Sequence, residues 1–134
     1  LIMYKFGNTS KRRMKGVNPK LIEIFEEAIK VSPIDFGIPQ FGGLRTEDDQ
    51  NSLFKAGKSK CDGYKKKSYH QSGNALDFYA YVNGKATWRN HHLSMIAGVI
   101  ISTANRMGVK VKWGGTFSSD DFSGWDMPHI ELID

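Results

Sequence analysis

The feature that most constrains this fold is an alternating run, "NALDFYAYVNGKATW", which spans residues 74–88. Side chains that alternate with a period of two indicate a β-strand, and the dipeptide Asn83-Gly84 favours a tight hairpin turn. Asp77 falls on the opposite face from the apolar side chains, so it is not forced into the core. The apolar face of the predicted strand consists of Leu76, Phe78, Ala80 and Val82.

Three other segments predict helices. Asn18 and Pro19 provide an N-cap and a first helical residue, and Pro33 lies beyond the end of the helix that they begin. A second, polar helix is expected to start at about Thr46, which can cap it. A third, in "WRNHHLSMIAGVIISTANRMG", is ended by Gly108. Its predicted apolar face consists of Leu93, Ile96, Ala97, Ile100, Ile101 and Ala104.

Short strands complete the predicted fold. The stretch "DFGIP" carries a proline, which suits the edge of a sheet, and "VKVKWGG" and "PHIELI" indicate two short strands near the C-terminus. The segment from residue 57 to residue 73 is rich in Gly, Ser and Lys and indicates a loop. This order of elements predicts an α+β fold, a small antiparallel sheet with flanking helices, in one domain spanning residues 3–134.

Composition narrows the classes of function. The single cysteine, Cys61, excludes an internal disulfide and a multi-cysteine zinc site. A net charge of +5 favours a polyanionic partner, which leaves open nucleic acid, an acidic membrane face and the anionic polymers of a cell envelope. No apolar stretch suits a signal peptide or a membrane span, so we expect synthesis as a cytoplasmic protein. Leu1 and Ile2 precede Met3, and their origin stays open.

Two strands are expected to carry metal-binding side chains on one face. His129 alternates with Ile130, as Asp77 alternates with Leu76, and His70 precedes Asp77 by seven residues, with a glycine between them. Two histidines and one carboxylate are a ligand set that catalytic zinc uses, with a fourth position left for water. The alternative is that these are polar residues with ordinary hydrogen-bond partners.

A carboxylate near the proposed metal ligands is a candidate proton carrier. Asp126 lies three residues before His129 in "WDMPH", and metal-assisted hydrolysis uses such a carboxylate as general base and then as general acid. Asp120 and Asp121 are rival candidates, but neither has this three-residue offset.

Both motifs together resemble a known family. "SYHQSGNALDF" fits Ser-x-His-x-x-Gly-x-Ala-x-Asp, and "WDMPHIEL" fits an acid-x-x-His followed by a strand. They resemble the zinc peptidases of the Hedgehog/DD-peptidase fold, which cut peptidoglycan stem peptides, and within these the phage endolysins that are L-alanyl-D-glutamate peptidases. The stretches "YKFGNTS", "SPIDFGIPQFGGLRT" and "YVNGKATW" extend the resemblance over nearly the whole chain from Met3.

The resemblance implies roles for individual residues. It implies one catalytic zinc ion held by His70, Asp77 and His129, with Asp126 as the acid/base. The match of "LRTEDDQ" to an Arg-Thr-x-x-x-Gln element implies that Arg45 and Gln50 line the substrate groove, and Ser68 is a third candidate for substrate binding. A guanidinium offers a carboxylate two hydrogen bonds. The alternatives are a surface ion pair of Arg45 with Glu47 or Asp48, and a turn-forming role for Ser68.

Some residues depart from the family pattern or are discounted. Tyr69 stands where small or basic residues are usual. The loop from Thr116 to Gly124 looks shorter than in members controlled by calcium, so calcium regulation is not carried over. His91 and His92 are adjacent at the start of a helix and cannot both face one metal ion. Trp125, beside Asp126, is a candidate for a groove wall.

Three functions compete at this stage. The favoured one is a phage or prophage endolysin that cuts the L-alanyl-D-glutamate bond, has no separate wall-binding domain, and reaches the wall from the host cytoplasm after a holin opens the membrane. The second is a D,D-carboxypeptidase or dipeptidase acting on D-alanyl-D-alanine, whose usual need for export counts against it. The third is a basic binding module without hydrolysis. We expect peptidoglycan as the partner, a monomer, no nucleic acid and no stable membrane insertion.

Overall fold

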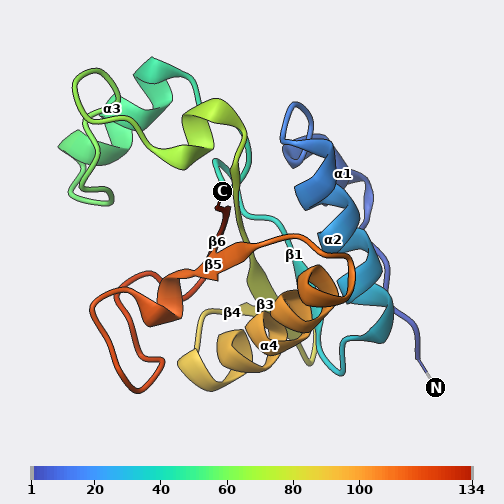
Figure 1. Cartoon of the computed structure of the whole chain (residues 1–134). Helices are drawn as coiled ribbons and strands as arrows, with labels where there is room; N and C mark the ends of the chain where they lie inside the picture. Colours follow the sequence, from blue (N-terminus) through green and yellow to red (C-terminus); the bar gives the residue numbers. More distant parts are fainter. Residues whose placement is uncertain (1, 134) are drawn as a thin grey trace.

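The chain folds into two small antiparallel sheets surrounded by helices (Figure 1). The structure, a computed structural model, describes residues 2–133, so Leu1 and Asp134 lie outside the described residues. One sheet has the strand order β1-β3-β4 and the other β2-β6-β5, which confirms the predicted α+β fold. The elements are α1 Asn8–Arg13, α2 Pro19–Val31, β1 Asp35–Gly37, α3 Glu47–Lys55, β2 Ala75–Asp77, β3 Tyr79–Val82, β4 Lys85–Thr87, α4 Asn90–Arg106, β5 Val111–Trp113 and β6 His129–Leu132, with 3-10 turns η1 Tyr69–Ser72 and η2 Gly114–Thr116.

Capping residues start the helices where the sequence predicts. The Asn18 side chain accepts a hydrogen bond from the Lys20 N–H at the start of α2, with Pro19 as the first helical residue. Thr46 and Asp49 form a reciprocal capping box at the start of α3, with distances of 3.0 and 3.3 Å. Local sequence therefore correctly predicts these two helix starts.

Helix α4 packs against α2, and its buried face differs from the prediction at one residue. The prediction for Ile101 is wrong, because this residue is 38% exposed. Successive helical residues are turned by about 100°, so Ile101 follows the buried Ile100 away from the core. Thr103 is buried instead, and its hydroxyl donates to the Val99 carbonyl. No described helix is both long enough and apolar enough to cross a bilayer.

The long predicted strand is divided between the two sheets. It breaks at Phe78, where β2 ends beside β6 and β3 begins beside β1. Phe78 is fully buried, its N–H donates to the Pro128 carbonyl, and its ring meets Phe25 of α2 and Phe36 of β1 edge to face. This core contact fixes the backbone directly after Asp77. The Asn83-Gly84 turn has φ angles of 52° and 76° and forms the predicted hairpin.

Helix α1 is not foreseen by the sequence analysis. It is six residues long, lacks an apolar stripe and buries a polar residue, Ser10. The Ser10 hydroxyl accepts a hydrogen bond from the Ile38 N–H, and the Arg13 guanidinium donates to the Ile38 carbonyl. Tertiary hydrogen bonds thus hold α1 beside the end of β1. As predicted, β1 lies at the edge of its sheet.

Candidate metal centre and active-site groove

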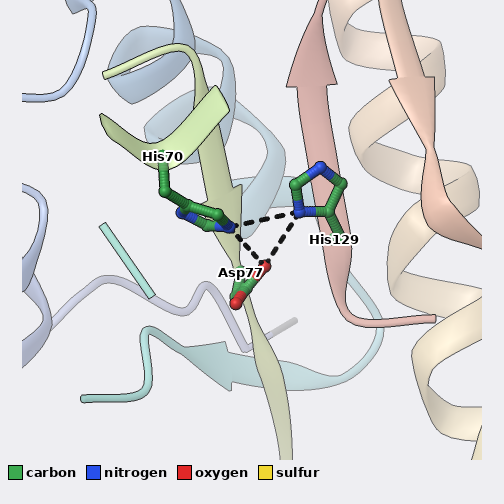
Figure 2. A group of neighbouring side chains, drawn as sticks. All are labelled: His70, Asp77 and His129. Carbon is green, nitrogen blue, oxygen red and sulfur yellow. Dashed lines mark hydrogen bonds and ion pairs between the residues drawn. The ribbon is translucent and has the colours of Figure 1, made fainter. Parts of the chain in front are cut away.

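Three side chains converge at one end of the β2–β6 pair (Figure 2). Asp77 ends β2 and His129 begins β6, and the two residues are direct partners in the antiparallel register. His70 comes from the turn η1, which the Ser68 cap and Gly73, with a left-handed φ of 76°, hold against β2. The structure therefore brings together the three residues that the sequence analysis selects as metal ligands.

The three ligand atoms form a nearly equilateral triangle. His70 Nε2 lies 3.1 Å from Asp77 Oδ1 and 3.2 Å from His129 Nδ1, and the latter atom lies 3.2 Å from Asp77 Oδ1. Tetrahedral ligands at zinc-like bond lengths are separated by about 3.3 Å from one another. The spacing and the two-nitrogen, one-oxygen composition both fit a tetrahedral zinc ion with one position left open.

Outer hydrogen bonds orient both histidine rings. His70 Nδ1 lies 3.0 Å from the Gly43 carbonyl, and His129 Nε2 lies 2.8 Å from Glu131 Oε1. A proton on each of these nitrogens leaves His70 Nε2 and His129 Nδ1 with free lone pairs toward the centre of the triangle. Gly43 is required for this approach, because a Cβ there would collide with the Arg13 carbonyl.

The pKa values of Asp77 and His129 are shifted in directions that favour a positive charge between them. Burial alone would raise the pKa of the Asp77 carboxyl, but the charge of His70 and hydrogen bonds from His129 and His70 hold this pKa well below its usual range. Burial alone would lower the pKa of His129, whereas hydrogen bonds to Asp77 and Glu131 raise it to about 10. Asp77 therefore stays ionised, and the positive charge beside it is a second proton on His129, which a metal ion would displace in order to bind Nδ1.

Asp126 stands beside the triangle and faces the groove. Its Oδ2 lies 3.7 Å from His129 Nδ1, and its side chain is 31% exposed. Burial and the Asp77 charge raise the pKa of the Asp126 carboxyl, while His129, His70 and Arg45 oppose the rise. A Cβ on Gly114 would overlap the Asp126 carbonyl, so the segment packs closely on η2.

The rival carboxylates lie elsewhere. Asp120 and Asp121 are exposed and are not among the described residues that line the groove. Asp121 instead accepts hydrogen bonds from the hydroxyls of Ser119 and Ser123. Among the three candidates for proton carrier, the geometry favours Asp126.

Arg45 is held by three partners. Its Nε donates to the Phe41 carbonyl at 2.7 Å, its Nη1 to Gln50 Oε1 at 3.0 Å and its Nη2 to Asp77 Oδ2 at 3.2 Å. The alternative of a surface ion pair with Glu47 or Asp48 does not describe it, because Glu47 pairs with Lys67 and Asp48 accepts from Tyr64. Arg45 therefore fixes the oxygen of Asp77 that points away from the histidines.

Gln50 and Ser68 are bonded within the protein. Gln50 is fully buried beneath the groove, and its Nε2 donates to Ser59 Oγ at 2.7 Å and to the Cys61 carbonyl at 2.9 Å. Ser68 lines the groove, but its hydroxyl also accepts from the His70 N–H and caps η1. Both residues support the site from behind, and only Ser68 also reaches the groove surface.

The groove beside the triangle has a volume of about 240 Å³. Trp125 forms one wall and is 55% exposed, and Phe117 lies between it and His129, with ring centroids 5.3 and 5.7 Å away. Another part of the rim comes from the loop after α3, residues 58–61. The groove is thus lined by an aromatic wall and a basic rim, which meet where Lys60 Nζ lies over the Trp125 ring.

The model of the phage L-alanyl-D-glutamate peptidase family matches residues 2–133. The chain belongs to this family. The L-alanyl-D-glutamate peptidase of Escherichia phage T5 is 30% identical over 138 residues, which cover 97% of this chain and 98% of that protein. The crystal structure of the Serratia marcescens L-Ala D-Glu endopeptidase ChiX superposes with a TM-score of 0.81 at 27% identity, over 98% of this chain and 91% of that chain. Both relatives thus match nearly the whole length of this phage-family peptidase.

One residue of the site was given no role in the sequence analysis of this peptidase. Glu131 shares a strand face with His129 two residues earlier, and it bonds His129 Nε2. The period-two alternation in "HIEL" was the available signal, since it places both side chains on one face. Whether Glu131 bonds His129 depends on the orientation of the His129 ring, which the local sequence does not determine.

Proposed function

We propose that this chain is a zinc-dependent peptidase that hydrolyses the L-alanyl-D-glutamate bond of peptidoglycan stem peptides. The observation that carries the proposal is the triangle of His70, Asp77 and His129, with Asp126 beside it in the groove. Membership of the phage L-alanyl-D-glutamate peptidase family supports the choice of bond.

Zinc fits the donor set better than a hard cation such as magnesium or calcium. Two imidazole nitrogens and one carboxylate oxygen are ligands that zinc accepts, whereas magnesium and calcium prefer oxygen ligands alone. When bound, zinc supplies a Lewis acid that polarises the peptide carbonyl and makes a water molecule easier to deprotonate.

The chain's own residues would handle protons and orientation. Asp126 accepts a proton from the attacking water and then donates it to the amino group of the leaving D-glutamyl residue. Arg45 holds Asp77, and Glu131 holds His129, so the ligand atoms keep their directions. Trp125 and Phe117 form an apolar wall of the groove beside the metal ligands.

The test is hydrolysis of purified peptidoglycan by protein of measured zinc content, with new termini identified by mass spectrometry. We expect new N-terminal D-glutamate from the wild type. Release of D-alanine would instead favour the D,D-carboxypeptidase alternative. Zinc-loaded protein that releases no peptide would contradict the enzymatic proposal.

Two variants separate the roles of the ligands and of Asp126. His129→Ala should lose both zinc and hydrolysis. Asp126→Asn should keep zinc and lose about 10²- to 10⁴-fold in kcat, the usual contribution of a general acid/base. Asp120→Asn is the matched control, because Asp120 is exposed and lies in the preceding loop; it should retain full activity. Loss of zinc in Asp126→Asn would reassign Asp126 as a ligand.

The remaining expectations accompany this proposal. The net charge of +5 supports attraction to an anionic cell wall. Action from the host cytoplasm after a holin opens the membrane, a single peptidase domain at residues 3–134, a monomeric state and the absence of nucleic-acid binding all stay predictions.

A further inference from the structure

Two lysines on the groove rim have no carboxylate partner. Lys58 and Lys60 line the same groove as the metal triangle, and among residues 2–133 neither forms an ion pair. Lys67, further along the same segment, is paired with Glu47 at 3.0 Å. Arg45, the cation that the sequence suggests for carboxylate recognition, is already bonded to Asp77. The unpaired positive charge of the groove therefore lies on the rim.

Trp125 places the Lys60 ammonium at one end of the groove. Lys60 Nζ lies 4.5 Å from the centroid of the Trp125 ring, a cation–π distance. Trp125 directly precedes Asp126, the proposed donor of a proton to the leaving amino group. Lys60 thus lies at the end of the groove where the leaving residue is expected.

The backbone that carries Lys60 is anchored to the metal centre. Gln50 donates to Ser59 and Cys61, the residues on either side of Lys60, and accepts from Arg45, which bonds Asp77. The Cys61 N–H also donates to Ser59 Oγ at 3.2 Å. A continuous chain of hydrogen bonds therefore fixes this rim relative to the metal ligands, which lowers the entropic cost of using it for binding.

The proposed substrate carries a group that matches this charge. A glutamyl residue has two carboxyl groups, and the stem peptide continues through only one of them. The second stays as a free carboxylate next to the bond that is cut, unless it is amidated. We propose that Lys60, assisted by Lys58, binds this free carboxylate of the D-glutamyl residue and makes the enzyme prefer the acid over the amide. This inference rests on the proposed function.

The test compares two synthetic peptides that differ only in this group, one with the free carboxylate and one with the amide. We expect the wild type to cleave the acid with a kcat/KM about 5- to 10-fold higher, as for a partly solvated charge-assisted contact. Lys60→Met should bring the acid-to-amide ratio close to one, and Lys60→Arg should keep most of it. Lys65→Met, at an exposed position in the same segment but outside the groove, is the matched control and should leave the ratio unchanged.

The outcomes separate the subsite from the activity. Cleavage of neither peptide by zinc-loaded wild type would reject the proposed function and the subsite with it. Equal cleavage of both peptides by the wild type, or the same fractional loss on both in Lys60→Met, would leave the peptidase activity standing and overturn the subsite. Zinc content and melting temperature of each variant show whether a loss arises from misfolding.

Discussion

The two sides of the groove are built differently. The metal-ligand side lies on β2, β6 and η1, where His70 is 2% and His129 6% exposed and every ligand has a second hydrogen-bond partner. The outer walls are loops with exposed side chains, Trp125 on one and Lys58 and Lys60 on the other. Figure 1 shows α3 and the segment after it projecting away from α2 and α4. The difference teaches that the three metal ligands lie on elements tied into the fold by hydrogen bonds, whereas the residues proposed for substrate choice lie on exposed loops.

The largest expected effect is removal of the metal. A strong chelator should abolish hydrolysis, and added zinc should restore it, because the proposed zinc ion would supply the Lewis acid that makes water easier to deprotonate. The fold should survive, since the ligands lie on strands held by the core and by Gly43 and Glu131. Far-ultraviolet circular dichroism should stay unchanged while the melting temperature falls, as for loss of any native-state ligand. Unfolding of the metal-free protein would show that the rigid side depends on the ion.

The next effect concerns the outer partner of His129. Glu131→Ala should weaken zinc affinity about 10- to 100-fold, because it removes the carboxylate that orients the ring. Competition with a fluorescent chelator measures this change. Glu23→Ala, at an exposed position on α2, is the control. Equal affinity in Glu131→Ala would mean that strand geometry alone orients His129.

Gln50 tests the connection between the two sides. Gln50→Leu should lower the free energy of unfolding by about 1 to 3 kcal/mol, because Arg45 and the Cys61 carbonyl lose a buried partner. It should also raise KM more than it lowers zinc affinity. The segment at residues 59–61 loses its hydrogen bonds to Gln50, while His70 and His129 keep theirs to Gly43 and Glu131. Denaturant titration, kinetics and zinc competition give the three quantities. Ser52→Leu is the control, because Ser52 is exposed on α3. If Gln50→Leu lost as much zinc affinity as Glu131→Ala, the separation of the two sides would be contradicted.

The smallest effect is expected at the aromatic wall. Trp125→Leu should raise KM about 2- to 5-fold, the size of an exposed cation–π contact, with no change in melting temperature or zinc content. Steady-state kinetics on a soluble stem peptide measures it. Trp88→Leu is the control, because Trp88 is similarly exposed and does not line the groove. A change of kcat alone would place Trp125 in the chemical step.

Local signals in the sequence predicted much of the fold. The caps at Asn18 and Thr46 and the Asn83-Gly84 turn depend on neighbours within a few residues, so the sequence analysis located them. The break at Phe78 escaped because the alternation of side chains continues across it, and only contacts with Phe25 and Phe36 divide the strand. Helix α1 escaped because its contacts are tertiary hydrogen bonds.

The same division holds for the candidate site. His70, Asp77, His129 and Asp126 lie in compact motifs whose spacing is visible in the sequence, and the structure brings them together. The Arg45–Asp77 pair joins residues 32 positions apart, and the burial of Gln50 depends on the loop that folds over it. Neither relation has a local signal. The sequence analysis placed both residues at the groove, which holds for Arg45 but not for Gln50, which is buried.

Asp77 divides its two oxygens between two tasks. Oδ1 contacts both histidines, while Oδ2 is held by Arg45. Redesign of this enzyme for other stem peptides is therefore constrained at Arg45, because any substitution there also removes the hydrogen bond that orients Asp77, a proposed metal ligand. Lys58, Lys60 and Trp125 carry no such double duty, so they are the positions at which substrate range can be altered while the catalytic centre is left intact.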